Sequence, residues 1–314
     1  MKLVFMGTPE FAVPSLLQLS ENGHNILSVV TVPDKQVGRG LKVRCSAVKK
    51  VALDLGIPIL QPEDLSAKEF YQRLQQLHAE LFVVVAFRIL PASVFELPSA
   101  GTINLHSSLL PKLRGAAPIN WAIINGHKET GVTTIFINTK VDTGDIILQK
   151  AVSIGDNETA GELHDRLAIL GAETLTETVK LIETGSAPRV VQTGETTRAP
   201  KITRELCQIN WQDSAEKIRN LIRGLSPYPG AYSYFAGQMI KIYSTVRSEI
   251  SPEDKTFSPG DVVYTDVKSG RLLVQTGEGL LEIVELQPAG KKRMTAKEYL
   301  SGYELKPGDF FEVV

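Results

Sequence analysis

The feature that most constrains the fold of this 314-residue chain is the alternation, over its first half, of short β-branched runs with segments of helical period. This pattern is typical of a mostly parallel sheet covered by helices, because parallel strands need a long crossover connection between them. We therefore predict an α/β fold. Strands are expected at residues 2–6, 26–32, 57–60, 81–86, 101–105, 133–138 and 146–151.

Two helices of this half carry end signals. Thr8 is expected to cap the first, with Pro9 at the first helical position and Glu10 in the first turn. Gly23 is expected to close it. A longer helix is expected from about residue 160 to residue 183, where apolar side chains recur near helical spacing.

A second domain follows a polar stretch that is rich in Thr and Pro, between residues 188 and 203. Beyond it, a helix is expected from Ser214 to Gly224, and then short alternating runs broken by Gly, Pro and Asp indicate a small β-barrel. We predict a first domain at 1–188, a linker at 189–205 and a barrel domain at 206–314. The barrel strands are expected at residues 232–235, 239–243, 261–264, 272–275 and 280–286.

Composition narrows the class of protein. The net charge of −1 gives no bulk signal for nucleic acid. The N-terminal apolar run is too short for a secretory signal or a membrane span, since Gly7 and Pro9 interrupt it. Cys45 and Cys207 are too few for a metal cluster or a disulfide framework. We expect a cytoplasmic protein without a membrane partner.

The best clue to chemistry lies at the end of a predicted strand. Asn104 and His106 are two residues apart and so share one face of that strand. Open parallel sheets bind ligands beyond the carboxyl ends of their strands. With Asp142 they supply a neutral donor, a titratable ring and a carboxylate, which suits acyl transfer to an amine. A satisfied polar pair and an ordinary turn aspartate are the structural alternatives.

Two weaker signals concern nucleotides and nucleic acid. The turn at Gly7 lacks the further glycines of the dinucleotide fingerprint, so a tight turn into a helix is the preferred interpretation. Residues 34–44 form a basic, glycine-containing loop that carries Arg39, Lys42 and Arg44. It can contact a phosphate backbone, but a solvated connection is the preferred interpretation, because charge runs usually face water.

Several motifs together carry a resemblance to a known family. The sequence around Asn104 and His106 resembles that of the folate-dependent formyltransferases, and within them the branch that formylates methionyl-tRNA. The similarity extends over essentially the whole chain. The motifs are Phe5 to Ala12, Pro33-Asp34, Gly38 to Gly40, Ser108 to Pro111, Arg114-Gly115, Pro118-Ile119, Asp142 to Asp145, Ile209 to Trp211, Pro227 to Gly230 and Leu286 to Lys292.

The resemblance implies a Rossmann-like, doubly wound catalytic domain followed by a smaller OB-like β-barrel domain that helps to hold tRNA. It implies that Asn104, His106 and Asp142 are the catalytic residues. By the same resemblance, Arg39 lies in an inserted loop that approaches the acceptor stem, with Lys42 and Arg44 beside it. The folate-lining residues that it implies are Ser108, Leu109, Leu110 and Pro111.

The implied reaction takes the formyl group of 10-formyltetrahydrofolate to the α-amino group of methionyl-initiator tRNA, for translation initiation. The implied donor is already activated, so we expect no metal, and we expect a monomer. Asp142 can either orient the His106 ring or relay the amine proton. The alternatives are a formyltransferase for a sugar-nucleotide amine, a formyl-folate hydrolase and, in a different class, a non-catalytic nucleotide- or RNA-binding module.

Overall fold

The computed structural model describes residues 1–37, 42–248 and 257–312. The chain divides into two compact units, each built from more than one stretch. We still propose a catalytic domain at 1–188, a linker at 189–205 and a barrel domain at 206–314 as the functional division of the chain. The first unit comprises Met1–Pro118, Thr130–Val152 and His164–Ala199, and the second comprises Ile119–Glu129, Ser153–Leu163 and Pro200–Val314.

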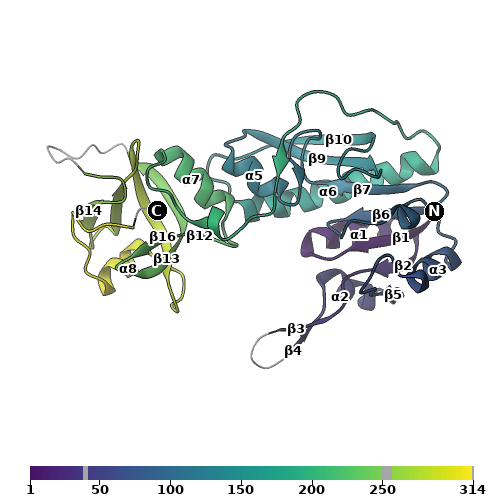
Figure 1. Cartoon of the computed structure of the whole chain (residues 1–314), viewed down its shortest axis with the longest axis horizontal. Coiled ribbons are helices and arrows are strands. Elements are labelled where there is room, and N and C mark those ends of the chain that lie inside the picture. The colour runs from purple at the N-terminus through teal and green to yellow at the C-terminus, as the bar shows by residue number, and fades with distance from the viewer. Residues whose placement is uncertain (38–41, 249–256, 313–314) are drawn as a thin grey trace. The chain divides into compact units, whose positions relative to one another are not determined.

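A seven-stranded sheet forms the centre of the first unit, with the strand order β10-β9-β7-β6-β1-β2-β5 (Figure 1). The pairings from β5 through to β7 are parallel, while β9 runs antiparallel to β7. All seven predicted strands are present, and the prediction of a mostly parallel sheet is confirmed. Their bounds are β1 Lys2–Gly7, β2 Asn25–Val30, β5 Ile59–Leu60, β6 Leu81–Val85, β7 Thr102–His106, β9 Glu129–Phe136 and β10 Ile146–Ser153.

The strand order places a reversal of direction at the centre of the sheet. From β1 the chain builds outward through β2 and β5, and then returns to place β6 and β7 on the other side of β1. In such sheets the crevice at the reversal, beyond the carboxyl ends of the strands, is the usual ligand site. Asn104 and His106 lie at the carboxyl end of β7, so the fold brings them to this edge.

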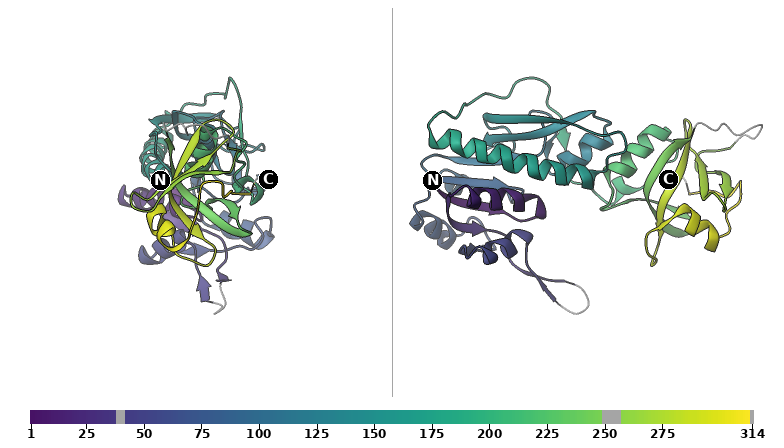
Figure 2. Two further views of the ribbon diagram at one scale, coloured as in Figure 1. Left: turned by 90° about the vertical axis from the view of Figure 1, so that its left-hand side faces the viewer. Right: turned by 180° about the vertical axis from the view of Figure 1, so that it is seen from behind.

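Helices cover both faces of the sheet, which confirms the doubly wound arrangement. On one face Val4 and Phe82 pack into a core with Phe70 of α3 and Val94 of α4. On the other face α6 lies along the sheet (Figure 2). Gly171 of this helix approaches Leu105 so closely that an added Cβ would be 2.7 Å from the leucine side chain. The helices of the first unit are α1 Val13–Glu21, α2 Ala47–Asp54, α3 Lys68–Gln76, α4 Ala92–Phe95 and all but the first turn of α6 Ala160–Glu183. Helix α5 Pro118–Ile124, apart from Pro118, belongs to the second unit.

The predicted start of the first helix is wrong. Pro9 is extended, with ψ 175°, and leads into a 3-10 turn, η1 Glu10–Ala12, before α1 begins at Val13. The helix therefore starts too late for Thr8 to reach its free N–H groups. The buried Thr8 hydroxyl has no hydrogen-bond partner among the described residues. Gly23 does follow the helix, with φ 78°, as predicted.

The basic segment after β2 is a hairpin rather than a plain loop. Strands β3 Lys35–Val37 and β4 Lys42–Arg44 pair antiparallel, with Lys35 opposite Arg44 (Figure 1). Short stretches of alternating polar residues and valine can form such a pair locally, which the sequence analysis did not allow for. Arg39 lies outside the described residues.

The second unit contains a five-stranded antiparallel path in the order β12-β13-β16-β15-β14, with β17 added at β16. Isolated bridges join Phe235 to Phe311 and Asp261 to Phe310, so residues 310–311 connect the two ends of this path. This agrees with the predicted OB-like barrel. The strands are β12 Ala231–Phe235, β13 Gln238–Ser248, β14 Val262–Asp266, β15 Arg271–Gln275, β16 Leu280–Pro288 and β17 Met294–Thr295.

Helix α7, Ala215–Gly224, packs on this sheet, and the predicted helix is confirmed. Ser214 caps it, because its hydroxyl accepts from the Lys217 N–H. The fully buried Trp211 lies in the core, and its indole N–H donates to the Ser233 hydroxyl at 3.0 Å. A 3-10 turn, η2 Glu205–Cys207, and a helix, α8 Ala296–Gly302, complete the second unit. The sequence analysis anticipated most of these elements, because each strand run is bounded by turn residues.

Candidate active site

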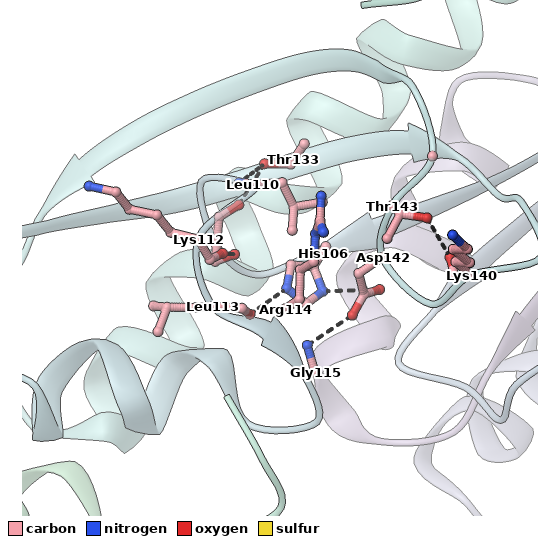
Figure 3. A network of polar contacts seen from close by, with 12 residues as sticks. His106, Leu110, Lys112, Leu113, Arg114, Gly115, Thr133, Lys140, Asp142 and Thr143 are labelled. Atoms are coloured by element: carbon pink, nitrogen blue, oxygen red, sulfur yellow. Dashed lines mark hydrogen bonds and ion pairs between the residues drawn. The ribbon is translucent and has the colours of Figure 1, made fainter. Parts of the chain in front are cut away.

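His106 is held at the end of β7 by a buried hydrogen bond. Its side chain is only 7% exposed, and Nε2 lies 2.9 Å from the backbone oxygen of Leu113. A carbonyl oxygen can only accept, so Nε2 must carry a proton. The other ring nitrogen, Nδ1, faces Asp142 Oδ1 at 3.7 Å (Figure 3). That distance is too long for a hydrogen bond but short enough for an ion pair when the ring is protonated.

Asp142 comes to this position from the loop that follows β9. Its backbone is left-handed, with φ 55°, a conformation that is uncommon outside glycine and that concentrates at functional sites. Its Oδ2 accepts a hydrogen bond of 2.9 Å from the Gly115 N–H, which fixes the carboxylate (Figure 3). The side chain is 11% exposed. One oxygen is thus anchored while the other faces His106.

The loop of residues 138–144, here called the site loop, is closed by its own hydrogen bonds. Asn138 Oδ1 accepts from the Lys140 N–H at 3.0 Å and from the Thr143 hydroxyl at 2.9 Å. Gly144 ends the loop against the backbone of Phe136, where an added Cβ would lie 1.6 Å from the carbonyl oxygen. No side chain fits there, so residue 144, two positions after Asp142, must be a glycine.

Asn104 and Asp142 line the same pocket, at the carboxyl ends of β6 and β7. The Asn104 side chain has no hydrogen-bond partner among residues 1–37, 42–248 and 257–312, so its amide is available to a bound molecule. The other lining residues are mainly apolar side chains and the site loop. They are Val84, Phe87, Arg88, Ile89, Leu90, Ile135, Ile137, Asn138, Thr139, Lys140, Val141 and Gly144.

Most of this pocket carries no signal in the sequence. Residues 87–90 follow Ala86, which ends β6 in a left-handed conformation with φ 47°. Nothing in the sequence marks that turn, since alanine rarely adopts it. The site loop carried a weak signal, because Asp, Thr and Gly together indicate a turn, but only Asp142 was singled out. Its remaining residues reach the pocket through the pairing of β9 with β7.

The residues predicted to line the folate site occupy a different place. Ser108 is fully buried and its hydroxyl donates to the Lys112 carbonyl at 2.6 Å. Leu110 is also buried, and its N–H donates to the Thr133 hydroxyl at 3.1 Å. Neither these two nor Leu109 and Pro111 belong to the residues that line the pocket. They shape the return of the chain from His106 to Leu113, and their contact with folate remains a prediction.

A segment predicted to be a linker belongs to the scaffold of the site. Strand β11, Arg198–Ala199, pairs in parallel with β8, Arg114–Gly115. The Thr197 carbonyl accepts from the Arg114 N–H at 3.0 Å. The Thr197 hydroxyl accepts from the Leu113 N–H at 2.9 Å. Leu113 and Gly115 are the backbone partners of His106 and Asp142. Residues 197–199 therefore support both members of the candidate catalytic pair.

Two of the three predicted nucleic-acid residues lie on the β3–β4 hairpin. Lys42 and Arg44 are the two ends of β4, and Arg44 is exposed. Arg39 falls outside the described residues. Their contact with tRNA remains a prediction.

Two features of other classes of protein are absent from the described residues. In the part of the chain that the structure describes, no helix is long and apolar enough to cross a bilayer. Among the same residues, no three His, Cys, Asp or Glu side chains are grouped so that they could hold a metal ion.

The fold and the site define an α/β protein whose pocket is lined by a free amide and by the aspartate of a buried His–Asp pair, and comparison with known proteins assigns its family. A family model described as formyl transferase matches residues 1–179, and a model of the formyl transferase C-terminal domain matches residues 201–304. The chain therefore belongs to the formyl transferase family, and the resemblance seen in the sequence is confirmed.

Curated relatives with high identity carry a single name. The chain is 48% identical over 311 residues to the methionyl-tRNA formyltransferase of Caldanaerobacter subterraneus subsp. tengcongensis, covering 98% of this chain and 99% of that protein. It is 46% identical to the methionyl-tRNA formyltransferase of Alkaliphilus oremlandii, with the same coverage.

Solved structures share the fold at low identity. The crystal structure of WlaRD, a sugar 3N-formyl transferase, in the presence of dTDP and 5-N-formyl-THF superimposes with a TM-score of 0.65. It is 22% identical over 93% of this chain and 99% of its own. HypX from Aquifex aeolicus in complex with tetrahydrofolic acid gives a TM-score of 0.65 at 16% identity, over all of this chain and 51% of its own. These likenesses show the fold alone.

Proposed function

We propose that this protein transfers the formyl group of 10-formyltetrahydrofolate to the α-amino group of methionyl-initiator tRNA, giving N-formylmethionyl-tRNA for translation initiation. The observation that carries this proposal is the match to methionyl-tRNA formyltransferases at 46–48% identity over 98% of the chain. Both domain families are matched as well, so the similarity includes the barrel and not only the catalytic sheet.

The pocket beside Asn104 and Asp142 suits the formyl-bearing end of a folate. Its mostly apolar walls can accept a flat ring, and backbone groups of the site loop can satisfy the polar edge of that ring. Tetrahydrofolic acid and 5-N-formyl-THF are ligands of two proteins with this fold, which supports a folate donor here. We infer that the ring lies against residues 87–90 and the site loop, with the formyl group directed toward Asn104.

The chemical step begins when the amine nitrogen attacks the formyl carbon. A carbon–nitrogen bond forms, the carbonyl electrons move to oxygen, and the tetrahedral intermediate carries a negative charge. Asn104 can donate an N–H to that oxygen, since its amide has no other partner among the described residues. The protonated His106 ring can donate from Nδ1, because Nε2 is already engaged by Leu113. Each such donor is worth about 100- to 1,000-fold in rate.

Asp142 balances the charge of the His106 ring and receives the proton that the attacking amine loses. Its Oδ2 is held by Gly115, so Oδ1 is the oxygen that can exchange a proton. When the intermediate collapses, the bond between the formyl carbon and N10 breaks, and N10 takes up one proton. Proton transfer of this kind contributes about 100- to 10,000-fold. The formyl donor is an amide of a weakly basic nitrogen, so we propose that the reaction needs no metal.

The direct test is incubation of the purified protein with 10-formyltetrahydrofolate and methionyl-tRNA, followed by mass spectrometry of the aminoacyl product. We expect a mass gain of one formyl group, undiminished by excess chelator. Release of free formate without a tRNA product would instead identify a formyl-folate hydrolase. Complete recovery of the donor after prolonged incubation would support a non-catalytic binding module.

A sugar-nucleotide amine remains the competing acceptor, because sugar N-formyltransferases share this fold. A parallel reaction with a dTDP-amino sugar separates the two acceptors. Consumption of the sugar nucleotide in place of methionyl-tRNA would overturn the proposed substrate while leaving the formyl transfer chemistry in place.

A further inference from the structure

Gln192 lies outside the seven-stranded sheet, in the segment predicted to be a linker, yet its side chain makes four hydrogen bonds at the candidate site. Its Nε2 donates to the backbone oxygen of Asp142 at 3.0 Å and to that of Gly144 at 2.8 Å. Its Oε1 accepts from Arg114, at 3.2 Å from Nε and 2.6 Å from Nη2. The side chain is partly buried.

The chemistry of these neighbours fixes the orientation of the amide. Arg114 can only donate, so it must face the oxygen of Gln192, and the two carbonyl groups can only accept, so they must face the nitrogen. A flipped amide would lose all four bonds. Glutamate could keep the bonds from Arg114 but would set a second acceptor against two carbonyl oxygens.

The contacts of Gln192 reach both elements that hold the Asp142 carboxylate. One element is the end of the site loop, which carries Asp142 itself in its left-handed conformation. The other is β8, because Arg114 is followed by Gly115, whose N–H binds Oδ2 of Asp142. Gln192 therefore ties the backbone that carries the carboxylate to the strand that anchors one of its oxygens.

We propose that Gln192 is a positioning residue that sets the placement of Asp142 against His106, an inference that rests on the proposed function. Gln192 does not line the pocket and is not expected to touch substrate. Displacement of a reacting group by about 1 Å can cost about 100-fold in rate. Loss of the amide bonds should therefore lower kcat through Asp142, without removing any group that binds tRNA.

The test measures kcat at saturating donor and acceptor for Gln192→Glu and Gln192→Ala, normalised to the folded fraction seen by circular dichroism. We expect both variants to lose about 10- to 100-fold. The matched control is Gln76→Glu, an exposed glutamine at the end of α3, which should retain the wild-type kcat. Unchanged kcat in both Gln192 variants, beside an active wild type, would overturn the inference.

A double-mutant cycle separates positioning from a general structural role. If Gln192 acts through Asp142, adding Gln192→Ala to Asp142→Asn should cost less than about 3-fold more. A further loss as large as in the wild-type background would show that Gln192 acts independently, and the inference would fail. If Gln192→Ala does not fold, Arg114→Met serves instead, because it removes the two donors that orient the amide and should lower kcat in the same direction. An inactive wild-type protein would point to failure of the proposed function itself.

Discussion

His106 comes from the end of β7 and Asp142 from the loop that follows β9, and Nδ1 of the ring lies 3.7 Å from Oδ1 of the carboxylate. The other polar atom of each side chain binds a backbone group: His106 Nε2 binds the Leu113 carbonyl, and Asp142 Oδ2 binds the Gly115 N–H. The two backbone groups belong to one short stretch of chain, which β11 supports by pairing with β8. The geometry of the pair is thus set by the main chain.

Replacing His106 with alanine should lower formyl transfer by about 100- to 1,000-fold, because it removes one donor to the developing oxyanion. The affinity for tRNA should stay nearly unchanged, since the ring is buried. Single-turnover kinetics and a filter-binding assay check the two parts. Unaltered turnover would contradict the proposed role.

Asn104→Ala should lower kcat to a similar extent without a loss of stability. The amide makes no hydrogen bond within the described chain, so its removal leaves no buried group unsatisfied. The measurements are kcat and the thermal midpoint. A large drop in the midpoint would indicate a structural role for this side chain instead.

Gly144→Ala should damage both stability and activity. The added Cβ would meet the Phe136 carbonyl at 1.6 Å, so the site loop must move. We expect a loss of about 1–3 kcal/mol in the free energy of unfolding, together with most of the activity. Gly302→Ala is the control, since nothing lies within 4 Å of its added Cβ. Equal denaturation curves for the two variants would refute the steric argument.

Arg39→Ala and Arg44→Ala should each weaken the use of tRNA and reduce the salt dependence of tRNA binding. A lost phosphate contact releases about one counterion fewer, which lowers the slope of log K against log salt by about 1. Arg73→Ala, on an exposed face of α3, should leave the slope as it is. If the Arg39→Ala and Arg44→Ala variants had the same salt slope as the wild type, these residues would not contact tRNA phosphates.

Glu298→Gln should destabilise the second unit in a pH-dependent way. Glu298 and Thr295 form a capping box at the start of α8, and the backbone N–H of Thr295, followed by its hydroxyl, lowers the pKa of the Glu298 carboxyl below its ordinary value of 4.5. A lowered folded-state pKa means that this stabilisation is present above pH 4.5 and is lost as the pH falls through the folded-state pKa. The thermal midpoints of wild type and variant should therefore differ at pH 7 and converge in acid. A difference that does not depend on pH would exclude the charged capping interaction.

The sequence alone predicts the central sheet well, because each buried strand is a short β-branched run between turn residues. It also places Asn104 and His106 correctly at the end of β7. The Thr8 cap fails because the competing extended conformation of Pro9 delays the helix by a few residues. Such a local choice depends on how the chain leaves β1, which propensities do not encode.

The parts of the site that sequence reasoning cannot supply are those made by contacts between distant segments. Gln192 lies in a polar stretch with no periodicity. Its role depends on hydrogen bonds to the carbonyl groups of Asp142 and Gly144, which are distant in the sequence. The pocket wall at residues 87–90 depends on the left-handed turn at Ala86. Neither feature has a local sequence signature.

The second unit has one property that bears on dissection of the gene. Asn120 Nδ2 donates to the Gly224 carbonyl at 2.8 Å, and Arg223 Nη1 donates to the Gly155 carbonyl at 3.2 Å. The stretches at 119–129 and 153–163 thus belong with residues after 200, although the sheet of the first unit interrupts them in sequence. A split at codon 200 would give an amino-terminal polypeptide that contains the whole first unit and a carboxyl-terminal polypeptide that lacks two segments of the second. Complementation by the co-expressed halves would then require the amino-terminal fragment to lend two of its segments to the carboxyl-terminal one.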